Sequence, residues 1–109
     1  MQKMIYTNTP DVPGRAIEEI LGVITGNVVQ SKHVGRDIMA GLKTIVGGEI
    51  KSYTEMLTEA RHTAINRLVQ EALKLDADAI VNIRFATSSI MSGSAEILAY
   101  GTAVKLKPT

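Results

Sequence analysis

Four side chains in this sequence carry groups that could hold a small anion or transfer a proton: Glu49, Tyr53, Arg61 and Arg84. Guanidinium groups donate paired hydrogen bonds to carboxylates and phosphates, and a tyrosine hydroxyl and a carboxylate would complete a polar cradle. Arg84 lies on the polar side of a strand that otherwise looks buried, so its charge needs an acidic partner or a ligand. The same four residues could instead form ion pairs between subunits, and this is the arrangement that we favour.

Metal ligands are few in this chain. It has no cysteine and only two histidines, His33 and His62, which fall on different predicted elements. Soft metals prefer sulfur ligands, and imidazole serves intermediate metals. The five methionines are scattered, and methionine mostly fills gaps in cores. We therefore assign no metal ligand and predict no cofactor, although subunits around a symmetry axis could share a site.

Two further patterns indicate structure rather than chemistry. Gly47-Gly48 precedes a predicted helix and could expose amides to an anion, but it lacks the Gly-Lys-Ser/Thr sequence of a phosphate-binding loop. We interpret the pair as the end of one helix followed by a turn. Ser88, Ser89 and Ser92 have no histidine nearby in the sequence, so no nucleophilic triad is supported.

Composition limits the class of protein. The 109 residues form one domain, 1–109, and the formal charge is +1 with no cluster of lysine and arginine. A nucleic-acid binder usually carries a basic stripe or stacking aromatic residues, so we expect no nucleic-acid partner. No apolar stretch has the length of a signal peptide or a membrane span, so we expect a cytoplasmic protein that does not bind membranes.

The clearest element is a long helix over residues 52–75. Ser52 and Glu55 form a capping box, in which each side chain accepts a hydrogen bond from the other residue's amide. Apolar residues follow at helical spacing in two adjacent rows, which make a wide stripe. These residues are Leu57, Ala60, Ala64, Ile65, Leu68, Val69, Ala72, Leu73 and Leu75. A stripe of this width needs two covering surfaces or a neighbouring subunit. A shorter amphipathic helix is predicted over 34–46.

The remaining pattern predicts strands. We expect strands over 3–7 and 20–30, a brief helical turn at 15–19, and bends or bulges at Gly22 and Gly26. From residue 81 the side chains alternate, so that Val81, Ile83 and Phe85 should share one face and Asn82 and Arg84 the other. The serine-rich stretch 87–94 is predicted to connect this strand to a last one over 95–106. In that last strand Ile97, Ala99, Gly101 and Ala103 form a flat face.

These elements predict an α+β fold in which a small, mainly antiparallel sheet is packed by one long helix and a shorter one. So small a sheet has exposed edges unless something pairs with them. With the wide helix stripe, this predicts self-association into a homo-oligomer.

Several segments resemble the YbjQ-like family of small uncharacterised proteins, to which a label of heavy-metal binding is attached. The segments cover almost the whole chain, and they are Thr9-Pro10, Leu21-Gly22-Val23-Ile24-Thr25-Gly26, Gly35-Arg36-Asp37, Val46-Gly47-Gly48-Glu49-Ile50, Tyr53-Thr54-Glu55, Glu59-Ala60-Arg61, Ala77-Asp78-Ala79-Ile80 and Ala99-Tyr100-Gly101-Thr102-Ala103-Val104. The resemblance implies a dodecin-like fold closed into a pentameric ring. Asp76 stands where the family pattern has glycine, so it must adopt a left-handed conformation at the helix end.

The combined expectation is a homo-oligomeric, pentameric protein that binds a small ligand or serves as a scaffold, with clefts between subunits. The candidate ligand-binding residues are Glu49, Tyr53, Arg61 and Arg84. Two alternatives stay open: a heavy-metal-binding protein, and an enzyme acting on a small anionic substrate at a cleft between subunits. We favour binding over catalysis, and the partners to expect are other copies of the chain and a small anion or a metal ion.

Overall fold

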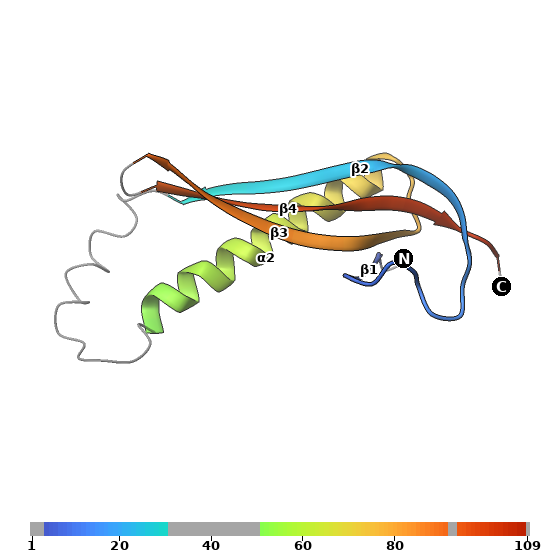
Figure 1. Ribbon diagram of the computed structural model, residues 1–109, viewed down its shortest axis with the longest axis horizontal. Helices are drawn as coiled ribbons and strands as arrows, with labels where there is room; N and C mark the ends of the chain where they lie inside the picture. Colours follow the sequence, from blue (N-terminus) through green and yellow to red (C-terminus); the bar gives the residue numbers. More distant parts are fainter. Residues whose placement is uncertain (1–3, 31–50, 92–93, 109) are drawn as a thin grey trace.

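A computed structural model describes residues 4–30, 51–91 and 94–108, without the side chains of residues 51–54 and 89–94. Four strands form one sheet in the order β1-β3-β4-β2, and helix α2 (Lys51–Lys74) crosses one face of it (Figure 1). The strands are β1 (Ile5–Tyr6), β2 (Ile17–Gln30), β3 (Ala79–Met91) and β4 (Ser94–Leu106). β1 runs parallel to β3, and the other pairs are antiparallel. The predicted α+β fold with a mainly antiparallel sheet is confirmed.

Close contact between α2 and the sheet depends on small residues. Along the helix Ala60, Ala64, Leu68 and Ala72 are at most 1% exposed. Facing them, Gly26 has no side chain, and a Cβ atom added there would collide with the helix backbone at Ala64 and Leu68. Ile97, Ala99 and Ala103 of β4 join the same core, as the sequence predicted. The helix can therefore lie directly on the backbone of β2.

A bulge at Asn82 changes which side chains of β3 face the helix. Asn82 has a φ of 55°, and the register with β4 shifts between Val81 and Arg84. An extra residue inverts the alternation of a strand. Ile83 accordingly packs in the core beneath α2, whereas Val81 packs with Val104 on the opposite face. The prediction that Val81 shares a face with Ile83 was wrong for this reason.

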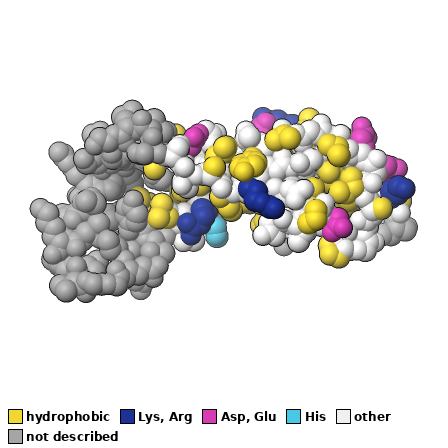
Figure 2. Space-filling model, viewed as in Figure 1, with side chains coloured by type: hydrophobic (Ala, Val, Ile, Leu, Met, Phe, Trp, Pro, Cys, Tyr) yellow, Lys and Arg dark blue, Asp and Glu magenta, His cyan; other side chains and the backbone are white. Residues whose placement is uncertain are grey.

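Among the described residues, the helix-free face of the sheet is covered at one end. There Ala79, Val81, Val104 and Leu106 form a second small core, with Val12 and Ile17 packed against it. Beyond this cover Val23, Val29 and Tyr100 are 74%, 55% and 37% exposed. Figure 2 shows hydrophobic side chains reaching the surface at many places on the face it presents. Several large apolar side chains of the described part of the chain are therefore exposed on this face.

β2, β3 and β4 are longer than the sequence suggested, whereas β1 is shorter than the strand predicted over 3–7. β2 begins at Ile17, which pairs with Leu106, so the helical turn predicted at 15–19 was wrong. The register with β4 shifts between Ile17 and Glu19 and again between Ile20 and Gly22. At the other end of the sheet, Thr87 and Ser88 belong to β3 and pair with Ile97 and Glu96 of β4. The connection predicted over 87–94 was therefore too long.

Of the two glycines at which bends or bulges were predicted, the structure has a bulge at Gly22 and none at Gly26. Gly22 has a φ of 147° at a register shift, which confirms a bulge. Gly26 shows no register shift, and its role is the close approach of α2 instead.

Asp76 has the predicted left-handed conformation, with a φ of 58°. Its amide donates to the carbonyl of Leu73 at 3.0 Å, and the amide of Ala77 donates to that of Ala72 at 3.1 Å, so α2 ends in a Schellman motif.

The short helix predicted over 34–46 and its glycine stop lie outside the described residues. The backbone of Ser52 and Glu55 lies within α2, but the side chain of Ser52 is not described, so the capping box stays a prediction. Within the described residues, no helix combines the length and apolar character that crossing a bilayer requires.

Candidate functional site: a hollow between α2 and β3

A hollow with a volume of about 650 Å³ opens where α2 passes over the edge of β3. Its wall comes from three segments: the stretch around β1, one face of α2, and the part of β3 that follows the bulge. The lining residues are Tyr6, Thr7, Asn8, His62, Ile65, Asn66, Ile83, Arg84 and Phe85. Three separate parts of the chain therefore build one concave surface.

The hollow exists because β1 covers the edge of β3 only briefly. The Thr7 amide donates to the Ile80 carbonyl at 3.0 Å, and the Ile83 amide donates to the Thr7 carbonyl at 3.1 Å. The Asn82 amide donates to the Thr9 carbonyl at 2.9 Å. The described backbone bonds between these segments end there, so the edge of β3 beyond Ile83 is open beneath the helix.

Arg84 is fixed at the rim of the hollow by two main-chain carbonyls. Its Nη1 donates to the carbonyl oxygen of Asn8 at 2.9 Å and to that of Ile83 at 3.0 Å. No described carboxylate lies within 4.0 Å of its guanidinium; the ion pairs that the described residues form join Lys74 to Glu71, and Lys105 to Asp76 and Asp78. The acidic partner that the sequence led us to consider is therefore not found among the described residues.

Helix α2 contributes His62, Ile65 and Asn66, which are spaced by three and four residues and so lie on one face. His62 and Asn66 are exposed, and Ile65 is half-buried against the core. On the strand side, Ile83 is buried and Phe85 is 46% exposed. The hollow thus has an apolar wall and a polar rim. The part of the lining that the structure describes contains no aspartate or glutamate.

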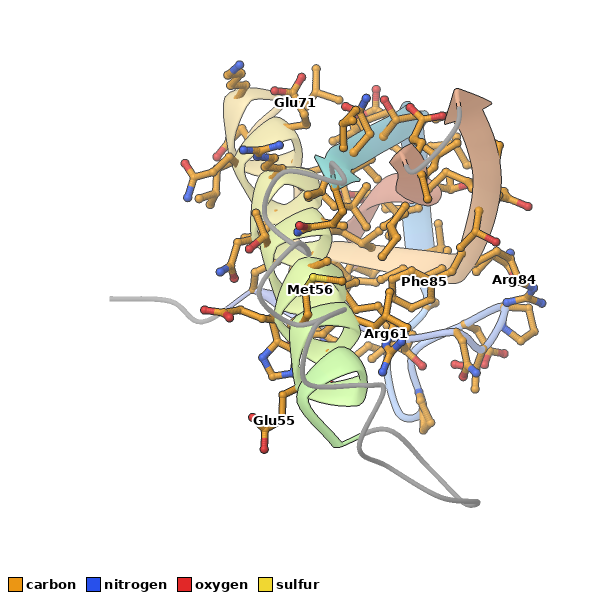
Figure 3. The ribbon with its side chains drawn as sticks, turned by 90° about the vertical axis from the view of Figure 1, so that its left-hand side faces the viewer. Glu55, Met56, Arg61, Glu71, Arg84 and Phe85 are labelled. Atoms are coloured by element: carbon orange, nitrogen blue, oxygen red, sulfur yellow. The ribbon has the colours of Figure 1, made fainter. Side chains whose placement is uncertain are left out.

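Two of the four candidate residues from the sequence have described side chains, and of these Arg84 lines the hollow whereas Arg61 does not. Arg61 is exposed and donates from Nη2 to the Thr58 hydroxyl at 3.2 Å. Figure 3 shows Arg61 projecting from α2, with Arg84 on the side of the molecule away from that helix. The backbone of Tyr53 belongs to α2, but its side chain is not described, and Glu49 lies outside the described residues. The four-residue constellation stays a prediction.

Sequence reasoning missed Asn8, Asn66 and Phe85 and considered His62 only as a metal ligand. The spacing of His62 and Asn66 does show that they share a helix face. No local sequence pattern predicts that this face of α2 meets the part of β3 that follows Asn82. That contact depends on the bulge in β3, which arises from the backbone conformation of Asn82.

The described residues do not fit a metal centre within one chain. No group of three or more histidine, cysteine, aspartate and glutamate side chains lies close enough together there to hold an ion. His62 is the one described histidine, and no carboxylate shares the hollow with it. A heavy metal needs several sulfur or nitrogen ligands, which this part of the chain does not bring together. His33 lies outside the described residues.

A family model described as "Putative heavy-metal-binding", YbjQ_1, matches residues 4–107. The chain belongs to this family. The match includes every residue that lines the hollow. The predicted YbjQ-like resemblance is therefore confirmed.

This member of the YbjQ_1 family is similar over almost its whole length to UPF0145 proteins from several organisms. A UPF0145 protein of Shewanella frigidimarina is 71% identical over 106 residues, which is 97% of this chain and 99% of the relative. A UPF0145 protein of Vibrio campbellii is 70% identical over 103 residues, 94% of this chain and 99% of the relative. A UPF0145 protein of Thermotoga maritima is 64% identical over 104 residues, which is 95% of this chain and 98% of the relative. None of these names states an activity.

A solved structure supports the fold. A crystal structure of a protein of unknown function from the DUF74 family, from Pediococcus pentosaceus, matches with a TM-score of 0.65. The match covers 97% of this chain and 100% of that one, at 16% sequence identity. At that identity the likeness concerns the arrangement of the strands and the helix.

Proposed function

We propose that this protein is a cytoplasmic homo-oligomer that binds a small molecule in the hollow between α2 and β3. The observation that carries the proposal is the hollow itself. Its volume of about 650 Å³ lies within the roughly 300–1,000 Å³ typical of small-molecule sites. Its lining combines apolar side chains with a few polar groups, which is the usual composition of such sites.

The chemistry of the lining favours binding over catalysis. Arg84, Asn8 and Asn66 supply hydrogen-bond donors, and Ile65, Ile83 and Phe85 supply an apolar wall. These groups orient a ligand by hydrogen bonds and apolar contact. His62 also lines the hollow and could transfer a proton, but no described carboxylate there orients its ring, as one does in a catalytic triad. An enzyme acting on a small anion would also require Glu49 and Tyr53 to reach this surface, and that alternative stays a prediction.

Self-association is supported by the surface of β2. Ile20, Val23 and Val29 are 70%, 74% and 55% exposed. β2 is an edge strand of 14 residues, and its outer side has no partner strand among the described residues. Long apolar edges promote pairing with another chain. A ring of identical subunits would cover this surface, and the family resemblance gives five as the expected number.

The oligomer can be tested by sedimentation equilibrium of the purified protein. We expect one species of five times the 11.7 kDa chain mass. The measurement should extend to nanomolar concentration, where a weak assembly would dissociate. A stable, folded monomer throughout this range would contradict the oligomer and leave the hollow to be tested separately.

Replacing Asn66 with phenylalanine is expected to abolish small-molecule binding, because the larger side chain would fill the hollow from the helix side. A fragment library screened by protein-observed NMR should give hits that shift the amides of Thr7, Ile83 and Phe85 in the native protein. The same hits should produce no shifts in Asn66→Phe.

Gln70→Phe is the matched control, since Gln70 is exposed one turn further along α2 and does not line the hollow. It should bind the hits as the native protein does. If no fragment shifts those amides, or if both variants lose binding equally, the proposed site is wrong.

Metal binding remains the second hypothesis because the family description names it. The described residues do not supply the ligands, so the hypothesis requires a site shared between subunits. Calorimetric titration of the demetallated oligomer with zinc, copper and cobalt tests it, and the absence of any binding heat would exclude it.

A further inference from the structure

We infer that the ligand of this hollow is a small aromatic acid, that is, a carboxylate or a phosphate carried on a flat apolar ring. The inference rests on the proposed function and specifies its ligand class. It follows from the donor geometry of Arg84, from the charge of the lining, and from the position of Phe85.

The guanidinium of Arg84 has one pair of donors that no described residue occupies. Both hydrogens of Nη1 are accounted for by the carbonyls of Asn8 and Ile83, at 2.9 and 3.0 Å. No hydrogen bond joins Nε or Nη2 to a described residue. In a planar guanidinium these two atoms carry parallel N–H bonds, which match the two oxygens of a carboxylate or phosphate. Because the main chain already fixes the group, an anion would bind without ordering a loose side chain.

The other polar groups of the hollow favour a negative ligand. Asn8 and Asn66 have amide donors, and His62 can donate from a ring nitrogen. Thr7 and Tyr6 add hydroxyl groups. The lining residues that the structure describes include no carboxylate, so none of them competes for Arg84 or repels an anion. A cationic ligand would meet the guanidinium without any compensating charge, so this class is disfavoured.

The apolar part of the ligand is indicated by Phe85. Its side chain follows Arg84 directly in β3 and is 46% exposed, although it faces the side of the sheet that α2 covers. Ile83 and Ile65 continue the apolar surface from the strand and the helix. Aromatic rings pair favourably when offset or edge to face. Arg84 and Phe85 are successive residues of β3 and point to opposite sides of the strand, but both line the hollow, which lies at the open edge of β3. A ring placed against Phe85 would bury this apolar surface, and an attached acid group would reach the guanidinium of Arg84 around that edge.

Isothermal titration calorimetry of the intact protein with four probes tests both parts of the ligand. Phenyl phosphate and benzoate carry a ring and an acid, inorganic phosphate lacks the ring, and benzyl alcohol lacks the charge. We expect one of the two aromatic acids to bind at least about tenfold more tightly than either single-feature probe, because charge-assisted hydrogen bonding and ring burial act together.

Arg84→Gln should weaken binding of the aromatic acid about tenfold or more, since it removes the charge and the paired donors. Arg84→Lys keeps the charge without the parallel donors, so it should give an intermediate loss. Arg67→Gln is the matched control: Arg67 lies on α2 and donates to the Asn27 carbonyl on β2, away from the hollow. It removes the same charge and should change the affinity less than twofold.

The outcomes separate the inference from the proposed function. Equal losses in Arg84→Gln and Arg67→Gln would show that net charge alone attracts the probe, and would overturn the role of Arg84. Benzyl alcohol binding as tightly as the aromatic acids would overturn the acid preference but leave a small-molecule site. Failure of all four probes would overturn the aromatic-acid class, and the wider fragment screen would then decide whether the hollow binds any small molecule.

Discussion

Gly26→Ala is expected to destabilise the fold by about 3 kcal/mol or more, at the upper end for an overpacked core. A Cβ atom at Gly26 would lie 2.5 Å from the Leu68 amide nitrogen and 3.1 Å from the Arg67 carbonyl carbon, and it would also overlap the Ala64 carbonyl oxygen. These are main-chain atoms, which cannot rotate away as a side chain can. The helix would have to move off β2 and open the core beneath it. Urea denaturation followed by circular dichroism measures the loss.

Gly14→Ala separates this collision from the general effect of replacing a glycine. Gly14 has a φ of 82°, and an added Cβ atom would have no neighbour within 4 Å. Backbone strain alone should therefore cost about 1 kcal/mol. If Gly26→Ala is no more destabilised than Gly14→Ala, the packing of α2 against β2 described above is wrong.

Leu68→Ala is expected to lower the free energy of unfolding by about 2–5 kcal/mol, the usual range for a fully buried leucine. The Leu68 side chain is 0% exposed and lies at the centre of the core that joins α2 to β2 and β4. Its neighbours belong to a helix and a sheet that cannot easily collapse into the space. The same denaturation experiment, performed at fixed protein concentration, gives the value.

Leu73→Ala is the control on the same helix. Leu73 is 52% exposed, so within a single chain its truncation should cost less than about 1 kcal/mol. A cost as large as that of Leu68→Ala would mean that Leu73 is buried in solution. Dilution would then show whether another subunit buries it, because the stability of an oligomer depends on concentration.

Much of the fold could be predicted because local sequence and tertiary packing agree. The small and apolar residues at helical spacing, from Ala60 to Ala72, indicate both the helix and the face that it buries. The flat face of β4 indicates where that helix packs. The errors occurred where tertiary pairing overrides local preference. A helical turn was predicted over 15–19, but Ile17 and Glu19 belong to β2, where they pair with Leu106 and Lys105.

The candidate site was much less predictable. The sequence indicated that the charge of Arg84 needs a partner. In the structure two main-chain carbonyls, those of Asn8 and Ile83, accept hydrogen bonds from its guanidinium. The sequence did not indicate that Asn82 would adopt a left-handed conformation and so invert which side chains of β3 face the helix. That single backbone feature places Ile83 and Phe85 beneath α2. The hollow is a product of this bulge and of the short β1, and neither has a distinctive sequence signature.

The most direct test is a crystal structure of the intact protein grown with phenyl phosphate. We expect phosphate oxygens within hydrogen-bond distance of Nε and Nη2 of Arg84, and the phenyl ring against Phe85. A hollow filled instead by side chains of a neighbouring subunit, with the probe bound nowhere near Arg84, would contradict the account.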